Sequence, residues 1–286
     1  MAGTSPSLTD PPTVDSHHHF WDLKRFDYEW MPPEPSVLRR SYLPTDLRPV
    51  LERNGVEWTV LVQAQASVEE AEFLLALATG AGFVAGVVAW VDLTSPDVGA
   101  SLDRLSRMGP LIGIRHVVET DPDEAWLSRD ASVRGLREVA HRGLAYDLLV
   151  KPPHLKHVPR LAERVPELRM VVDHIAKPPI ASGEMEPWVS DIAAVAAIPG
   201  IYCKVSGMVT EADHSGWTVA DLRPYVAHVV ERFGFGRLMW GSDWPVCLLA
   251  SSYDDVRLAA IDALGPMTAE DRDGVLGRNA TDFYRL

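Results

Sequence analysis

The chain has 286 residues, roughly twice the common domain length and within the range of a single α/β barrel. Hydrophobic residues make up 47% and charged residues 23%, a composition typical of a water-soluble globular protein with a large core. The formal net charge is -13, which disfavours polyanionic partners. We therefore expect neither nucleic acid nor a membrane surface as a partner.

The cysteines and the apolar segments indicate the compartment. The two cysteines, Cys203 and Cys247, have neither the paired spacing of a zinc ribbon nor the density of a disulfide scaffold. Residues 1–12 are small, polar and proline-bearing, so we expect a flexible tail and no secretory leader. The apolar runs stop well short of the roughly 20 residues of a membrane span. We expect a cytoplasmic protein in which residues 13–286 form one domain.

Short β-branched segments alternate with longer segments of helical periodicity, as in βα units repeated around a parallel sheet. The predicted strands are Thr13–His19, Trp58–Gln63, Val84–Val91, Ile112–Val118, Ala145–Val150, Arg169–His174, Ile201–Ser206 and Arg237–Ser242. The predicted helices include Val68–Thr79, Val98–Arg107, Val133–His141, Val158–Val165 and Leu222–Phe233. Eight such strands predict an α/β fold of the (β/α)8 TIM barrel type.

An open doubly wound sheet would give a similar alternation, but it usually has a glycine-rich phosphate turn after its first strand. Here residues 17–21 read His-His-His-Phe-Trp, which favours the closed barrel. Residues 20–43 form a long segment rich in Trp, Tyr and Pro, and we expect a lid or a binding wall there. A further helical segment, Leu264–Leu286, is expected to pack on the outside of the barrel.

Polar side chains stand where three of the predicted strands end, which is the edge at which barrel enzymes build their sites. Alternation along the first strand puts His17 and His19 on one face, while His18 points away. His174 ends the sixth strand and Asp243 follows the eighth. Three imidazole nitrogens and one carboxylate oxygen are a ligand set for a zinc-type ion with an open coordination position.

A single histidine on a strand is more often a hydrogen-bonded structural residue than a ligand. The structural role is the better interpretation for His18, which faces the wrong side. Four such residues at three strand ends of one barrel are difficult to attribute to packing, because buried polar groups are costly without partners. We therefore predict a functional site at His17, His19, His174 and Asp243.

Five motifs, in the same order along most of the chain, resemble the sugar-lactonase branch of the amidohydrolase superfamily, with L-fuconolactonases as the most similar members. The motifs are Asp15-Ser16-His17-His18-His19-Phe20-Trp21-Asp22, Gly113-Ile114-Arg115-His116, Asp173-His174-Ile175-Ala176-Lys177-Pro178-Pro179, Tyr202-Cys203-Lys204-Val205-Ser206-Gly207 and Gly241-Ser242-Asp243-Trp244-Pro245-Val246-Cys247. The resemblance implies a (β/α)8 barrel, hydrolysis of a lactone ring and a site drawn from the first, sixth and eighth strands.

The chain departs from the superfamily pattern where many members hold a second metal ion. Those members have a carboxylated lysine or a glutamate on strand four and a histidine on strand five. Here strand four offers Arg115 and His116, and Lys151 follows strand five. We expect at most one divalent ion, of zinc type, on His17, His19, His174 and Asp243; the resemblance also implies that some relatives work without a metal.

Hydrolytic attack on an ester carbonyl is the chemistry that these groups support. Asp243 is the expected general base for a water molecule, and it can return the proton to the departing ring oxygen. His174, with His17 and His19, is expected to stabilise the oxyanion directly or through a metal. The predicted substrate contacts are Arg115, His116, Lys204, Trp30 and Trp244.

Each predicted substrate contact has a structural alternative. The cationic side chains could instead pair with Asp92 or Asp173, and a tryptophan is often a packing anchor. Only Arg115 is well placed to bind a carboxylate, with Arg25 in the first loop as a second candidate, so a neutral polyhydroxy lactone fits better than a dicarboxylate. Two alternative functions remain open: a metal-dependent nonoxidative decarboxylase on the same barrel, and a noncatalytic carbohydrate- or metal-binding barrel.

Overall fold

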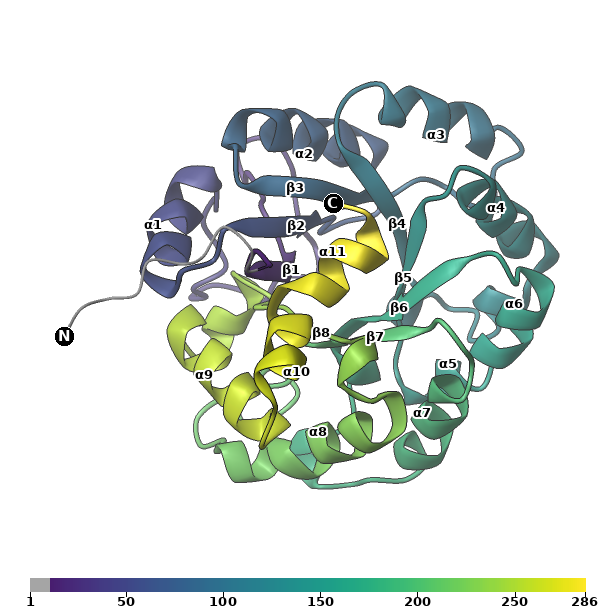
Figure 1. The fold of residues 1–286 in the computed structure, drawn as a ribbon. Helices are drawn as coiled ribbons and strands as arrows, with labels where there is room; N and C mark the ends of the chain where they lie inside the picture. Colours follow the sequence, from purple (N-terminus) through teal and green to yellow (C-terminus); the bar gives the residue numbers. More distant parts are fainter. Residues whose placement is uncertain (1–10) are drawn as a thin grey trace.

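A computed structural model describes residues 11–286, and its centre is a single sheet of eight parallel strands in the order β1 to β8 (Figure 1). The strands are β1 Val14–His18, β2 Trp58–Val62, β3 Val84–Ala89, β4 Leu111–Val117, β5 Ala145–Leu149, β6 Arg169–Val172, β7 Tyr202–Val205 and β8 Leu238–Trp240. Each overlaps one predicted strand, so the predicted (β/α)8 barrel is confirmed. Residues 1–10 of the predicted tail 1–12 lie outside the described residues.

The barrel is nearly closed where the last strand meets the first. The residues that follow β8 bond to β1: the Asp243 amide donates to the His17 carbonyl at 2.8 Å, and the His19 amide donates to the Trp244 carbonyl at 2.7 Å. The Ser16 hydroxyl donates to the Trp240 carbonyl at 2.7 Å. This seam brings the segment after β8 against the end of β1, and it fixes where two of the predicted site residues meet.

Helices surround the sheet on the outside (Figure 1). They are α1 Pro44–Asn54, α2 Val68–Ala81, α3 Val98–Ser106, α4 Asp130–His141, α5 Pro152–Leu155, α6 Val158–Arg164, α7 Trp188–Ala196, α8 Val219–Phe233, α9 Tyr253–Leu264 and α10 Ala269–Asp273; the last helix, α11 Asn279–Tyr284, is placed differently. Local sequence explains several boundaries. The Ser67 hydroxyl accepts the Glu70 amide at the start of α2, and Gly55 ends α1 in the left-handed region.

Two apolar clusters form the core. The larger one lies between the strands and the helices, and the smaller one fills the barrel interior with Val14, Val60, Val62, Val88, Ala145, Val171 and Met239, together with Ala280, Phe283 and Tyr284 from α11. A barrel filled in this way is a packed core and not a pore. Within residues 11–286, no helix combines the length and apolar character needed to cross a membrane.

The position of the last helix differs from the prediction. Leu264–Leu286 is largely helical, but α11 does not pack on the outer ring; it lies across one end of the barrel, as its yellow ribbon in Figure 1 shows. Phe283 packs against Tyr202, the first residue of β7, with the rings tilted and their centroids 4.9 Å apart. The apolar residues of α11 face the ends at which the strands begin, so the opposite end is left for the site.

The long segment between β1 and α1 is held by aromatic packing. Trp21, Tyr28 and Tyr42 are buried, and the backbones of Trp21 and Tyr42 pair with each other. Trp21 lies edge-on to Tyr42 at 5.5 Å and to Trp30 at 5.7 Å. Trp30 remains 44% exposed. The segment is therefore an ordered wall whose outer tryptophan is available to a ligand.

Candidate active site

The end of β1 presents two imidazoles to the same point. His17 Nε2 lies 3.2 Å from His19 Nε2, while His18 Nε2 lies on the other face of the strand, 2.9 Å from the Thr59 hydroxyl. His19 Nδ1 lies 2.8 Å from the Val62 carbonyl, which can accept a hydrogen from it. That bond leaves the lone pair of His19 on Nε2, toward the cavity.

His174 reaches the same point from a left-handed turn that follows β6. Four consecutive non-glycine residues, His174 to Lys177, have φ values of 54, 47, 62 and 48°. This backbone costs about 1 kcal/mol or more for each residue, so the surrounding structure must hold it. Gly207 supplies the room, because a Cβ there would lie 2.5 Å from His174 Nδ1. The Ser206 hydroxyl lies 2.9 Å from the same nitrogen.

Asp243 completes the group from the segment after β8, where its φ of 56° turns the side chain toward the imidazoles. Its Oδ1 lies 3.3 Å from His19 Nε2 and 3.9 Å from the Nε2 atoms of His17 and His174. Burial opposes ionisation of this carboxyl, but the neighbouring His174 and His19 rings lower its pKa below the usual range. Burial lowers the pKa of His174 to about 4. At neutral pH the site holds a carboxylate beside a neutral His174.

These atoms are spaced as the ligands of one small divalent ion. Tetrahedral zinc bonds of about 2.1 Å place neighbouring ligand atoms about 3.4 Å apart; His17 and His19 lie 3.2 Å apart, and Asp243 lies 3.3 to 3.9 Å from the three imidazoles. His17, His19 and Asp243 form one candidate metal group, and His17, Asp173 and His174 form another. The donor atoms of His17, His19 and Asp243 therefore fit one divalent ion, and His174, 3.9 Å from Asp243, remains the predicted fourth ligand.

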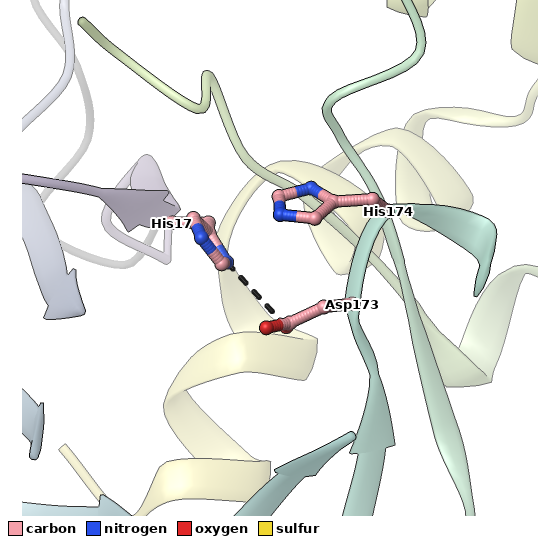
Figure 2. A group of neighbouring side chains, drawn as sticks. All are labelled: His17, Asp173 and His174. Carbon is pink, nitrogen blue, oxygen red and sulfur yellow. Dashed lines mark ion pairs between the residues drawn. The ribbon is translucent and has the colours of Figure 1, made fainter. Parts of the chain in front are cut away.

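Asp173 lies on the far side of the His17 ring, and Figure 2 shows its carboxylate directed at that ring. Asp173 Oδ1 is 3.4 Å from His17 Nδ1, the arrangement of a carboxylate that orients an imidazole. Burial opposes the charge of Asp173, but Lys204 and His17 hold the pKa of this carboxyl well below its usual range. Burial and the Lys204 ammonium also lower the pKa of His17 well below its usual value.

Lys204 lies beneath the cavity and not on its wall. Its side chain is fully buried, and Nζ lies 2.5 Å from Asp147 Oδ2, 3.0 Å from Asp173 Oδ1 and 3.1 Å from His17 Nδ1. Lys204 therefore does not line the cavity, and its predicted contact with substrate stays a prediction. The physical reason is that the inward face of β7 points into the packed barrel interior, where two carboxylates compensate its charge.

The two predicted contacts on β4 lie on opposite faces. Arg115 lines the cavity, with Nη1 3.1 Å from Asp173 Oδ2 and 3.3 Å from His17 Nε2. His116 faces the outer layer, where its ring stacks on Trp126 at 4.0 Å. Alternation along the strand explains the difference, and it removes His116 from the cavity wall.

The cavity has a volume of about 680 Å³ and opens above the imidazoles. Asp27, Glu29 and Trp30 line it from the segment after β1. Of the two tryptophans predicted to contact substrate, only Trp30 lines the cavity. Trp244 is 4% exposed and packs edge-on against Tyr42, with ring centroids 5.1 Å apart. Trp244 is a packing residue beneath the wall.

Lys177 and Glu119 also line the cavity, although sequence reasoning assigned them no role. Lys177 Nζ lies 2.9 Å from Glu119 Oε2 and 3.8 Å from Glu211 Oε1. Burial opposes the lysine charge, but Glu119 and Glu211 raise the pKa of Lys177. The only signal for Lys177 was its place in the Asp173–Pro179 motif; the left-handed turn that brings it into the cavity has no signature in the sequence.

Comparisons with known proteins find relatives over nearly the whole chain. The amidohydrolase family matches residues 14–286. An L-fucono-1,5-lactonase of Burkholderia ambifaria is 40% identical over 280 residues, covering 96% of this chain and 95% of the relative. A second L-fucono-1,5-lactonase, of Burkholderia multivorans, is 36% identical, with 96% of each chain covered.

Solved structures give the same result. A crystal structure of an amidohydrolase from Burkholderia multivorans with bound HEPES has a TM-score of 0.90 and 34% identity, covering 96% of this chain and 99% of that one. Another, with bound zinc, has a TM-score of 0.88 and 35% identity over the same shares. A match over nearly the whole chain, to proteins of the same barrel, leads to one conclusion: the chain belongs to the amidohydrolase family.

Proposed function

We propose that this protein opens a sugar lactone, L-fucono-1,5-lactone or a related aldonolactone, to the aldonic acid. The observation that carries the proposal is the Asp243 carboxylate, which lies within 3.3 to 3.9 Å of three imidazole nitrogens at the floor of a cavity. Relatives named L-fucono-1,5-lactonase, at 40% and 36% identity, support the choice of substrate.

Asp243 is the general base in this proposal. Its lowered pKa keeps it ionised at neutral pH, so the carboxylate can take a proton from a water molecule as the water oxygen bonds to the lactone carbonyl carbon. When the tetrahedral intermediate collapses, the bond from carbon to the ring oxygen breaks. The protonated Asp243 then returns its proton to that oxygen, which leaves a free hydroxyl and a carboxylic acid.

The negative charge on the former carbonyl oxygen needs donors. Arg115 lines the cavity as a permanent cation, and it is the chain's own group best placed to stabilise this charge. An ion of zinc type held by His17, His19, His174 and Asp243 would supply Lewis-acid polarisation of the carbonyl when bound. The chain's residues orient these ligands through Val62, Ser206 and Asp173 whether or not the ion is present.

The charge of the wall supports a neutral, hydroxyl-rich substrate. Asp27, Glu29 and Glu119 line the cavity, and its two cations, Arg115 and Lys177, already pair with carboxylates. Carboxylate substrates need unpaired guanidinium or ammonium groups, and paired ones bind them poorly. Carboxylates and a tryptophan face, in contrast, suit sugar hydroxyls and the apolar side of a sugar ring.

The two alternative functions gain no support. Structures named as decarboxylases share only 14% and 13% identity with this chain, which is a likeness of fold alone. A barrel that binds sugar without turnover would not need an ionised carboxylate among imidazoles. The compartment is part of the proposal: Cys203 and Cys247 are free and buried, which fits the reducing cytoplasm.

The test is a proton-release assay on a panel of 1,5- and 1,4-lactones of hexoses and 6-deoxyhexoses, corrected for spontaneous opening. Each lactone is assayed with enzyme treated with chelator, and with the same enzyme after zinc is restored. We expect L-fucono-1,5-lactone or a stereochemical relative to open far faster than the background. If every lactone opens at the spontaneous rate in both preparations, the proposal is wrong.

A further inference from the structure

A continuous series of buried polar side chains crosses the barrel from α11 to the active site. The Tyr284 hydroxyl donates to the Asp147 carboxylate, with oxygen separations of 2.8 and 2.9 Å. Asp147 Oδ2 accepts from Lys204 Nζ at 2.5 Å, and Lys204 Nζ lies 3.1 Å from His17 Nδ1. Tyr284 and His17 are therefore joined by a series of buried polar contacts that crosses the barrel.

The charges in this interior balance. Two cations, Lys204 and Arg115, face two carboxylates, Asp147 and Asp173. Leaving a buried charge without its partner destabilises the folded protein by several kcal/mol. The charged form of each of these four side chains is therefore stabilised by the other three. Neutralising one carboxylate would leave an excess positive charge beside His17 and would redirect Lys204 toward Asp173.

Asp147 is the member of this group that can lose its charge near neutral pH. Burial raises the pKa of Asp147 to about 6; Lys204 lowers it, Asp173 raises it, and the Tyr284 hydroxyl lowers it. The groups that face Asp147 are Arg115 on β4, Asp173 directly after β6, Lys204 on β7 and Tyr284 on α11. Burial raises the pKa of Tyr284 well above its usual value, so its hydroxyl remains a donor.

Packing alone does not require the Tyr284 hydroxyl. The tyrosine ring belongs to the apolar cluster inside the barrel, beside Phe283 and Ala280, and a phenylalanine would fill the same volume. The hydroxyl contacts only Asp147 among the described residues. Its hydrogen bond is thus the polar link between α11 and the interior network.

We propose that Tyr284 is a positioning residue for the active site, acting through Asp147 and Lys204 to fix the orientation of the His17 imidazole. Asp147 holds Lys204 in the position from which its ammonium pairs with Asp173 Oδ1, the carboxylate that faces His17 Nδ1, and Tyr284 keeps Asp147 charged and in place. The inference rests on the proposed lactonase function for its kinetic readout, but not for its spectroscopic readout.

The test compares Tyr284→Phe with wild type and with Tyr225→Phe. The control removes another hydroxyl bond, which Tyr225 on α8 donates to the Glu184 carbonyl outside this network. We expect the acid limb of the kcat profile of Tyr284→Phe to move to higher pH by about one pH unit. The variant should then be about fivefold slower than wild type at pH 6 and near wild type at pH 8, with KM unchanged.

Two results would overturn the proposal. One is a Tyr284→Phe profile that overlaps that of wild type. The other is a loss of rate that is the same at pH 6 and pH 8 and follows the loss of folded protein in thermal melts, because that pattern belongs to a purely structural hydroxyl. Asp147→Asn provides a second variant: it should be slow at both pH values, and adding Tyr284→Phe to it should change little.

A measurement without substrate separates this inference from the proposed function. In protein labelled with ¹⁵N-histidine, the His17 ring nitrogens should shift in Tyr284→Phe at pH 6 and remain at their wild-type positions in Tyr225→Phe. If wild type opens no lactone while this shift occurs, the function is wrong and the positioning role holds. If wild type is active and the His17 signals stay in place, the positioning role is wrong.

Discussion

Asp243 Oδ1, from the segment after the last strand, lies 3.3 Å from Nε2 of His19, from the end of the first strand. The contact exists because the barrel closes: the Asp243 amide bonds to the His17 carbonyl, and the Trp244 carbonyl accepts the His19 amide. The fold thus places a carboxylate against imidazoles that are distant along the chain.

Replacing Gly207 tests the support of His174. Gly207 has a φ of 60°, and an added Cβ would lie 2.5 Å from His174 Nδ1. We expect Gly207→Ala to lower kcat at least tenfold, because the imidazole must move, and to destabilise the fold by about 2 kcal/mol. Gly200→Ala is the matched control: its φ is 79° with no atom within 4 Å, so it should lose stability and keep kcat. Equal kcat for both variants would contradict the account.

Zinc binding separates His19 from its neighbour His18. His19 Nε2 belongs to the candidate metal group, whereas His18 Nε2 faces Thr59. Zinc at about 100 times its Kd should stabilise wild type and His18→Gln by about 2.7 kcal/mol, which raises the melting temperature, and it should do little for His19→Gln. Thermal melts with and without zinc measure this directly. An undiminished zinc effect in His19→Gln would exclude the proposed ligand set.

Trp30 is expected to contact the sugar. It lines the cavity and is 44% exposed, whereas Trp58, 41% exposed, is the first residue of β2 and lies outside the cavity wall. Loss of a stacking face of about 1 kcal/mol should raise KM roughly fivefold in Trp30→Ala. Trp58→Ala should leave KM unchanged. If steady-state kinetics give both variants the same KM, Trp30 has no role in binding.

Glu70 gives a pH dependence of stability. It is fully buried, and its Oε2 accepts the amides of Ala64 and Gln65 at 3.1 Å. Burial raises the pKa of Glu70 from 4.5 to about 7. A carboxyl with a raised folded pKa contributes stability that is fully present below pH 4.5 and is lost as the pH rises through 7.

Glu70→Gln removes that titration. Relative to the variant, wild type should lose about 3 kcal/mol of unfolding free energy between pH 4.5 and pH 8, which urea unfolding at both pH values measures. The control is Glu69→Gln, which replaces an exposed neighbour on the same helix. Relative to this variant, the unfolding free energy of wild type should not fall by about 3 kcal/mol between the two pH values. Parallel pH curves for wild type and Glu70→Gln would show that burial does not perturb Glu70.

The sequence was sufficient for those features that depend on local periodicity. β-branched runs located the strands, alternation separated His17 and His19 from His18, and the strand ends pointed to His174 and Asp243. Features that depend on depth within the barrel were not predictable. Alternation sends both Arg115 and Lys204 inward, but only the packed interior decides that Arg115 reaches the cavity while Lys204 lies beneath it.

Other features could not be predicted from the sequence because they depend on packing between segments that are distant along the chain. Polar residues in Leu264–Leu286 indicated an outer helix, yet α11 lies across the barrel end and sends Tyr284 into the interior. There the Tyr284 hydroxyl donates a hydrogen bond to Asp147, and no local sequence pattern predicts this contact. The left-handed turn at His174 to Lys177 is equally invisible, because none of its residues is glycine.

The most direct measurement is the rate of L-fucono-1,5-lactone opening by wild type and by Asp243→Asn, with folding checked by thermal melts. The amide keeps the shape of the carboxylate but cannot take a proton from water, so we expect kcat to fall by about 10²–10⁴-fold while the variant stays folded. A folded Asp243→Asn that retains a rate within threefold of wild type would contradict the account.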